Sequence, residues 1–135
     1  MHIGLSPRKR LACPECGVLC GRYDSRPRSW RHLDTMQYRT VLTADVPRVR
    51  CKKHGVKQVR VPWAEPGSRL TALFESLVID WLKEASTSAV ARMLRMSWDE
   101  VDGVMSRAVA RALARRESLP AAKDRCRRNL LPKGT

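Results

Sequence analysis

The sequence predicts a small zinc ribbon of short antiparallel β-strands, followed by an all-α helix-turn-helix domain. In the first half, potential metal ligands occur in two pairs at three-residue spacing, Cys13/Cys16 and Cys51/His54, within a stretch rich in β-favouring residues. In the second half, apolar residues recur at helical spacing in segments that begin at serines. We therefore expect a basic arm at 1–12, a ribbon at 13–64, a helical domain at 68–118 and a disordered tail at 119–135.

The charge of the chain is concentrated in the ribbon half. The 135 residues carry a formal net charge of +14. Residues 1–63 hold 14 Lys/Arg against 4 Asp/Glu, residues 64–118 hold 8 against 8, and residues 119–135 hold 5 against 1. Arginine forks bind phosphate oxygens, so double-stranded DNA is the expected partner. No apolar run is long enough to span a membrane, and we expect neither a membrane nor a small-molecule substrate.

The two ligand pairs predict a structural Zn²⁺ site formed by Cys13, Cys16, Cys51 and His54. Gly17 and Gly55 each follow the second ligand of a pair, where a knuckle turn needs an open backbone angle. Four protein ligands complete a tetrahedron and leave no open position for catalysis. A thiol redox enzyme using Cys13 and Cys16 is the competing interpretation, but it gives no role to the second pair.

Two further residues resemble ligands without having a partner at knuckle spacing. Cys20 follows the first pair by four residues, and we interpret it as a spare thiol or core residue that could still replace a ligand. His32 lies in a strand segment without a neighbouring ligand, so a surface or packing role is expected.

The ribbon half is expected to alternate loops with strands. The arm at 1–12 is too short to fold, and polar residues indicate a loop around 21–27. Strands are expected between residues 28 and 50, with turns near Asp34 and Pro47, and again at 56–61. Trp30, Tyr38 and Trp63 are expected in the core in preference to DNA contacts. The basic residues expected to contact DNA are Arg8, Lys9, Arg10, Arg28, Arg31, Arg39, Arg48, Arg50 and Arg60.

Three helices are expected in the second half. The first runs from an N-cap at Ser68 to about residue 85, the second from 89 to about 94, and the third from 98 to 116. Ser97 and Glu100 match a capping box at the start of the third helix. The apolar residues expected to face inward are Leu70, Leu73, Phe74, Leu77, Val78, Trp81, Leu82, Val90, Ala91, Met93, Leu94, Trp98, Val101, Val104, Met105, Ala108, Val109, Ala112 and Leu113.

The short second helix and the capped third helix have the proportions of a helix-turn-helix, whose second helix enters the major groove of DNA. Phosphates would repel Asp99, Glu100 and Asp102, so a packing or dimerising helical unit is the alternative. The side chains expected to contact DNA are Ser97, Trp98, Asp102, Ser106 and Arg107.

Several stretches carry a resemblance to a known family. They are Cys13-Pro14-Glu15-Cys16-Gly17, Trp30-Arg31-His32-Leu33-Asp34, Arg48-Val49-Arg50-Cys51, Val61-Pro62-Trp63-Ala64 and Ser97-Trp98-Asp99-Glu100-Val101. In this order, over about residues 10–118, the sequence resembles the start of a bacterial insertion-sequence transposase of the ISL3 (ISL-three) family. The resemblance implies a zinc finger with Cys13, Cys16, Cys51 and His54 as ligands, then a helix-turn-helix that binds the terminal inverted repeats of the element. It also implies a bacterial cytoplasmic protein, associated with the nucleoid when bound, acting as a homodimer or with a full-length transposase.

The segment 119–135 departs from the family. The resemblance implies a ribonuclease-H-like catalytic domain after the helix-turn-helix, and its first aspartate is expected near this segment. We hypothesise that a frameshift near Ala122 separated the chain from that domain, leaving a truncated, non-enzymatic DNA-binding fragment. The alternatives are a free-standing zinc-ribbon and helix-turn-helix transcriptional regulator, or a protein-interaction module.

Overall fold

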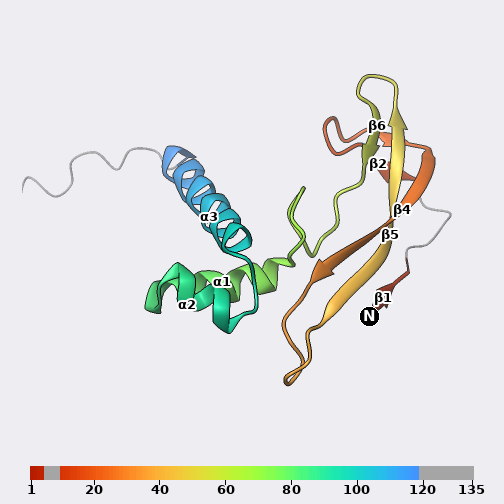
Figure 1. The fold of residues 1–135 in the computed structure, drawn as a ribbon. Helices are drawn as coiled ribbons and strands as arrows, with labels where there is room; N and C mark the ends of the chain where they lie inside the picture. Colours follow the sequence, from red (N-terminus) through yellow and green to blue (C-terminus); the bar gives the residue numbers. More distant parts are fainter. Residues whose placement is uncertain (5–9, 119–135) are drawn as a thin grey trace, which may run out of the picture. The chain divides into compact units, whose positions relative to one another are not determined.

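The computed structural model describes residues 1–4 and 10–118, in which strands precede three helices (Figure 1). The chain divides into two compact units, Met1–Trp81 and Leu82–Thr135. Arg8, Lys9 and the tail at 119–135, including the frameshift hypothesis, lie outside the described residues. The elements are β1 (His2–Ile3), β2 (Leu11–Ala12), β3 (Leu19–Cys20), β4 (Arg22–Arg31), β5 (Val41–Cys51), β6 (Gly55–Gln58), α1 (Ala72–Glu84), α2 (Thr87–Met93) and α3 (Trp98–Ser118).

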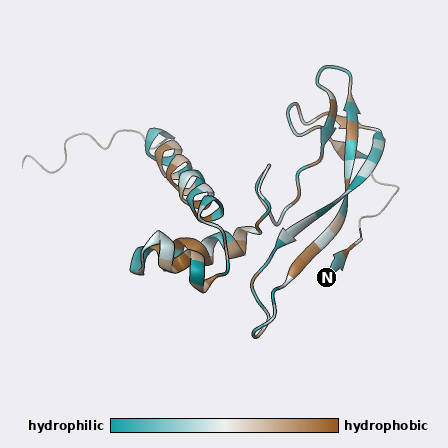
Figure 2. Cartoon of the chain, in the orientation of Figure 1, coloured by the Kyte–Doolittle hydropathy of each residue, from teal (hydrophilic) through white to brown (hydrophobic). Residues whose placement is uncertain are grey.

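The long strand β5 is the centre of the main sheet. Antiparallel β4 pairs with it from Arg22↔Val49 to Arg31↔Val41, and a register shift occurs between Arg22 and Asp24. Antiparallel β6 and parallel β1 also pair with β5. Buried and exposed positions alternate along β5, as expected for a strand with one face on a core. Figure 2 shows that β5 carries both hydrophobic and hydrophilic residues along its length.

Two loop predictions in this sheet were wrong, and in both cases a proline had suggested the loop or turn. β4 runs through the expected loop at 21–27. Pro27 is tolerated there because β4 is an edge strand, where a missing N–H leaves no partner unsatisfied. β5 runs through the expected turn at Pro47. The Pro47 carbonyl accepts a hydrogen bond from Val59 N at 3.0 Å, and the reciprocal bond cannot form because proline has no N–H. Pairing beyond β6 therefore ends at Pro47. The predicted turn near Asp34 does occur between β4 and β5.

The prediction that residues 1–12 form an unfolded arm was also wrong for its described part. The Met1 amino group donates to Val41 O at 3.0 Å, and Thr43 N donates to Met1 O at 2.8 Å. The β1 register begins at His2↔Thr43, whereas β6 pairs with β5 only from Arg48 onward. β1 thus satisfies backbone groups on a part of β5 that β6 does not reach.

Two tryptophans form the centre of the ribbon core. The rings of Trp30 and Trp63 meet edge to face at 5.5 Å and 84°, an arrangement that aromatic pairs favour. Trp30 lies in a buried cluster with Ala44, Val46 and Ala64, against which Trp63 packs. The core prediction is therefore confirmed for both tryptophans, whereas Tyr38 is 78% exposed and the prediction was wrong there.

Helix α1 begins later than predicted. Residues before it extend along the end of β4, where Arg31 N donates to Arg69 O and Thr71 N donates to Arg31 O, each at 2.9 Å. These bonds hold the backbone extended, so Thr71 becomes the cap and its hydroxyl accepts from Phe74 N at 3.3 Å. The buried Ser68 instead donates to Glu75 Oε1 at 2.8 Å.

The second unit contains the predicted helix-turn-helix pair. Arg95 follows α2 with φ +52°, Met96 N donates to Ala91 O at 2.9 Å, and Arg95 N donates to Arg92 O at 3.3 Å. This is the Schellman pattern that ends helices, with arginine where glycine is usual. The capping box is confirmed: Glu100 N donates to the Ser97 hydroxyl at 3.1 Å, and Ser97 N donates to the Glu100 carboxylate at 2.9 Å.

The apolar stripes of the helices are only partly buried. Phe74, Val78, Val90, Val101 and Val104 are almost completely buried, as predicted. The prediction was wrong for a second group, which is exposed by 37–61%, because periodicity identifies a face but not how much of it is covered. These residues are Leu73, Trp81, Met93, Trp98, Met105, Val109 and Leu113.

Candidate metal centre and nucleic-acid interface

The first half of the candidate metal centre is a turn between β2 and β3. Leu11 and Ala12 pair with Cys20 and Leu19, which closes a short hairpin around Cys13 and Cys16. Cys13 N donates to Val18 O, and Gly17 N donates to Cys13 O, each at 2.9 Å. Gly17 has φ +72°, which L side chains rarely adopt, so the glycine permits this turn.

The second half is built in the same way between β5 and β6. Cys51 is the last residue of β5 and pairs with Gly55, the first residue of β6. Gly55 has φ +71°, close to the value at Gly17. His54 occupies the turn immediately before this glycine, as Cys16 does in the first hairpin.

The two hairpins bring Cys13, Cys16, Cys51 and His54 together. Their four potential ligand atoms all lie within 4.8 Å of one another. The Sγ atoms of Cys16 and Cys51 are 3.6 Å apart, and His54 Nδ1 lies 3.8 Å from Cys13 Sγ and 3.6 Å from Cys51 Sγ. Four ligands at about 2.3 Å from a central Zn²⁺ would be separated by about 3.7 Å. The donor set and its spacing therefore fit a tetrahedral zinc ion bound through His54 Nδ1.

Backbone groups favour thiolates at two of the cysteines. Hydrogen bonds from the backbone N–H groups of His54 and Lys53 lower the pKa of Cys51 to about 6. Backbone N–H groups of Cys16 and Glu15 likewise lower the pKa of Cys13. At Cys16 the N–H of Val18 acts in the lowering direction, but burial and the neighbouring thiols outweigh it, so the pKa is raised. Thiolate is the form of cysteine that binds a metal.

Glu15 supports the centre from outside and was missed by the sequence reasoning. Its carboxylate lies 3.7 Å from His54 Nε2 and 2.8 Å from Lys57 Nζ. A ligating histidine commonly directs its second ring nitrogen toward such a carboxylate, which fixes the orientation of the ring. The usable signal was the position of Glu15 between the two ligands of the first turn.

Cys20 and His32 do not join the cluster. The Cys20 thiol donates to Val18 O at 3.3 Å, and burial followed by the proximity of Cys51 raises its pKa. His32 Nδ1 is 2.9 Å from the Thr71 hydroxyl, so this half-buried ring connects the end of β4 to the start of α1. The packing role expected for His32 is confirmed.

The structure places the arginines expected to contact DNA in different environments. Arg10, Arg28, Arg39, Arg50 and Arg60 are exposed. Arg31 is only 5% exposed, forms an ion pair with Asp34 at 3.2 Å and lies over the Phe74 ring at 4.5 Å. Its expected DNA contact is wrong, because a buried, paired guanidinium cannot reach a phosphate.

A bulge in β4 creates an arginine–tyrosine cluster near the second hairpin. Tyr23 lies at the register shift, with Arg50 at 4.6 Å and Arg48 at 5.6 Å from its ring centre. Asp24 pairs with Arg48, with its carboxylate 2.6 Å from Arg48 Nε, and this hydrogen bond lowers the pKa of Asp24. Arg48 is therefore partly engaged within the ribbon, whereas Arg50 remains exposed.

The residues expected at the start of the recognition helix are accessible. Ser97, Trp98 and Ser106 are exposed, with Trp98 at 56%, and Asp102 and Arg107 are half-buried. A Cβ built on Gly103 would lie 3.4 Å from Arg107 Nη1, so the Arg107 side chain extends back over this glycine. The first turns of α3 thus present polar and aromatic groups together with the carboxylates of Asp99 and Glu100.

A ribbon with a Cys₃His cluster, followed by a helix-turn-helix, defines a two-part nucleic-acid-binding class of protein. Residues 9–54 match the model for the zinc-finger of transposase IS204/IS1001/IS1096/IS1165, and residues 59–109 match the model for the helix-turn-helix domain of transposase family ISL3. The chain therefore carries the zinc finger and the helix-turn-helix domain of ISL3-family transposases.

Two curated relatives support the same assignment. The chain is 37% identical over 98 residues to the transposase for insertion sequence element IS1557 from two strains of Mycobacterium tuberculosis. The match covers 70% of this chain but only 22% of each relative. No solved structure matches the chain. None of the described helices combines the length and the apolar character needed to cross a membrane.

Proposed function

We propose that this chain is a DNA-binding part of a transposase that recognises the terminal inverted repeats of an insertion sequence. The observation that carries the proposal is the α2–α3 helix-turn-helix, whose second helix leaves Ser97 and Trp98 exposed at its start. In this motif the first turns of the second helix contact base edges in the major groove. Ser106 lies eight residues after Trp98, about two helical turns further along a similar side of α3.

The proposed role of the metal is structural. Cys13, Cys16, Cys51 and His54 supply four donors, so a bound Zn²⁺ would have no open position for a substrate. Zinc would fix the two hairpins and thereby the exposed arginines of the ribbon. One zinc per chain by elemental analysis, lost together with DNA binding on chelation, is the expected result.

The proposed activity of the described residues is binding and not catalysis. Strand transfer in this family is expected to need a carboxylate cluster that holds divalent metals. Within residues 1–4 and 10–118, the cluster that could hold a metal is the Cys₃His group. The proposed partner places the site of action in the bacterial cytoplasm, at the nucleoid.

Site recognition can be tested with labelled duplexes. We expect tighter binding to the ends of the element that encodes the chain than to shuffled duplexes of equal length. Trp98→Ala should reduce this preference by about tenfold, the value of one good base contact. Leu73→Ala, a truncation of an exposed apolar side chain in α1, is the matched control. Equal binding of the wild-type chain to element ends and shuffled DNA would exclude site recognition.

We also propose self-association through α3. Met105, Val109 and Leu113 recur at four-residue spacing and are 38%, 53% and 52% exposed. A second copy offers the same stripe, and a symmetric dimer needs one self-complementary patch. A full-length transposase carrying the same helix would pair in the same way. Sedimentation equilibrium should show a dimer that Val109→Glu weakens; a monomer at all concentrations would exclude it.

A further inference from the structure

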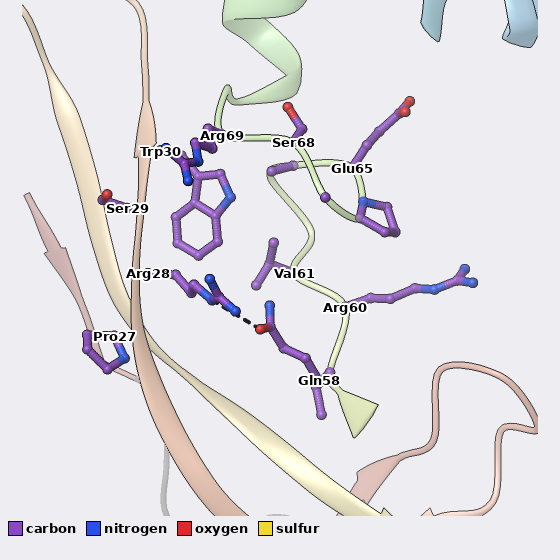
Figure 3. Close-up of a pocket in the computed structure, with 14 residues that line it drawn as sticks. Pro27, Arg28, Ser29, Trp30, Gln58, Arg60, Val61, Glu65, Ser68 and Arg69 are labelled. Carbon is purple, nitrogen blue, oxygen red and sulfur yellow. Dashed lines mark hydrogen bonds between the residues drawn. The ribbon is translucent and has the colours of Figure 1, made fainter. Parts of the chain in front are cut away.

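A groove of about 700 Å³ opens on the ribbon unit, between β4 and the segment that follows β6 (Figure 3). Its floor belongs to the buried core: Trp30 is 5% exposed, Ala64 is 9% exposed, and Val61 packs against the same cluster. Because core residues form this floor, the shape of the groove is set by the fold of the ribbon.

The rim of the groove is strongly basic. Arg28, Arg60 and Arg69 line it and are exposed, and Glu65 is the one acidic residue among those that line it. Figure 3 shows Arg28 and Gln58 meeting across the groove, with Arg69 beside Trp30 and Arg60 directed outward. The groove therefore combines an apolar floor with the two arginines Arg28 and Arg69 at its opening.

Arg28 is held in position by one hydrogen bond. Its Nε donates to Gln58 Oε1 at 3.2 Å, which connects β4 to the end of β6. A guanidinium has further N–H donors on its two terminal nitrogens, arranged as a fork that matches two oxygens of one phosphate. The bond thus orients the fork without using it.

We propose that this groove binds the sugar-phosphate backbone of duplex DNA, with Arg28 and Arg69 as the phosphate-binding forks. The proposal rests on the proposed DNA-binding function and identifies where the ribbon holds its ligand. Backbone is favoured over an unstacked base, because Trp30 is too deeply buried to offer its face for stacking. The ribbon would then position the protein on DNA while α3 reads the sequence.

Because phosphates are common to all sequences, the test uses a labelled duplex of arbitrary sequence and fluorescence anisotropy. Arg28→Ser and Arg69→Ser should each weaken binding by about tenfold. Each should also reduce the slope of log affinity against log salt by about one. Arg26→Ser is the matched control: Arg26 is exposed on the same strand, two residues away, but does not line the groove. It should weaken binding by less than about threefold, through loss of long-range attraction alone.

The outcomes separate the groove from the function on which it rests. Equal weakening by all three substitutions, with zinc content and tryptophan fluorescence unchanged, would overturn the groove and leave DNA binding intact. No binding of any duplex by the zinc-loaded wild-type chain would overturn both proposals. Binding of a poly-glutamate peptide that depends on Arg28 and Arg69, without such dependence for DNA, would assign the groove to an acidic protein segment and overturn the proposal.

Discussion

In the ribbon, the four side chains that meet at one point come from two hairpins separated by more than thirty residues of sequence. In the helix-turn-helix, the contacts that fix the turn join residues three to five positions apart, such as Ser97 with Glu100 and Met96 with Ala91. The ribbon also carries most of the net positive charge, whereas residues 64–118 are balanced. The ribbon is thus closed by residues far apart in the sequence, at a cluster that could hold a metal ion, whereas the turn of the helical pair is fixed by residues close together in the sequence.

The largest effect is expected when one buried candidate ligand is removed from the ribbon. Cys51→Ser should abolish zinc binding and unfold the ribbon, because metal binding in such modules contributes about 10–16 kcal/mol. Near-ultraviolet circular dichroism, sensitive to the packing of Trp30 against Trp63, should lose its signal. The helical signal at 222 nm should change less, because α2 and α3 contain no proposed ligand.

The control for this experiment is Cys20→Ser, the same atomic change at a thiol outside the cluster. It should leave one zinc per chain and an unchanged spectrum. If Cys20→Ser lost zinc and Cys51→Ser kept it, the ligand set would be wrong.

The next effect concerns Arg31, a buried structural arginine, in contrast to the exposed arginines that are proposed to contact DNA. Arg31→Gln removes a buried guanidinium that pairs with Asp34 and lies over Phe74, and should reduce the free energy of unfolding by about 2 kcal/mol. Arg50→Gln, at an exposed arginine of the same sheet, should leave stability within about 0.5 kcal/mol. Urea unfolding of the two zinc-loaded variants measures this contrast, and equal stability would contradict the buried role of Arg31.

A core truncation should produce a similar loss in the helical unit. Val101→Ala, at a completely buried position, should cost about 2 kcal/mol through lost contacts and a cavity. Met93→Ala, in the same helical unit but 53% exposed, should cost little. Thermal unfolding followed at 222 nm gives both values, and a larger effect at Met93 than at Val101 would contradict the burial of Val101.

The smallest effects are predicted for the residues that affect only the cap and the helix propensity of α3. Ser97→Ala should cost about 1 kcal/mol by removing the cap, and Gly103→Ala should stabilise by about 1 kcal/mol through helix propensity. The Cβ added at Gly103 meets only the flexible end of Arg107. Ser106→Ala, an exposed position within α3, is the control for the hydroxyl. If Gly103→Ala failed to stabilise, the glycine would be required for more than helix geometry.

The sequence predicted features that depend on short spacings. The two ligand pairs, the glycines after them and the Ser97–Glu100 box all follow rules that span four or five residues, and the structure has each of these local turns. It also predicted the order of a β-rich half followed by three helices.

The failures arose where distant residues decide the outcome. Nothing local to Arg31 shows that Phe74 will lie against its guanidinium, and nothing local to Pro47 shows that Val59 will hydrogen-bond to its carbonyl. Ser68 lost its expected capping role because residues 69–71 are held against the end of β4. The exposure of Met105, Val109 and Leu113 could not be read from periodicity, which gives the direction of a face but not its neighbours.

The close agreement of the backbone angles at Gly17 and Gly55, +72° and +71°, gives the metal centre an internal symmetry. Each hairpin is an equivalent half-site that presents a strand-end cysteine and a second donor just before the glycine. We therefore expect each half to accept a different donor without a change in the other half. A chain with cysteine in place of His54, or with histidine in place of Cys16, is expected to keep the same turn.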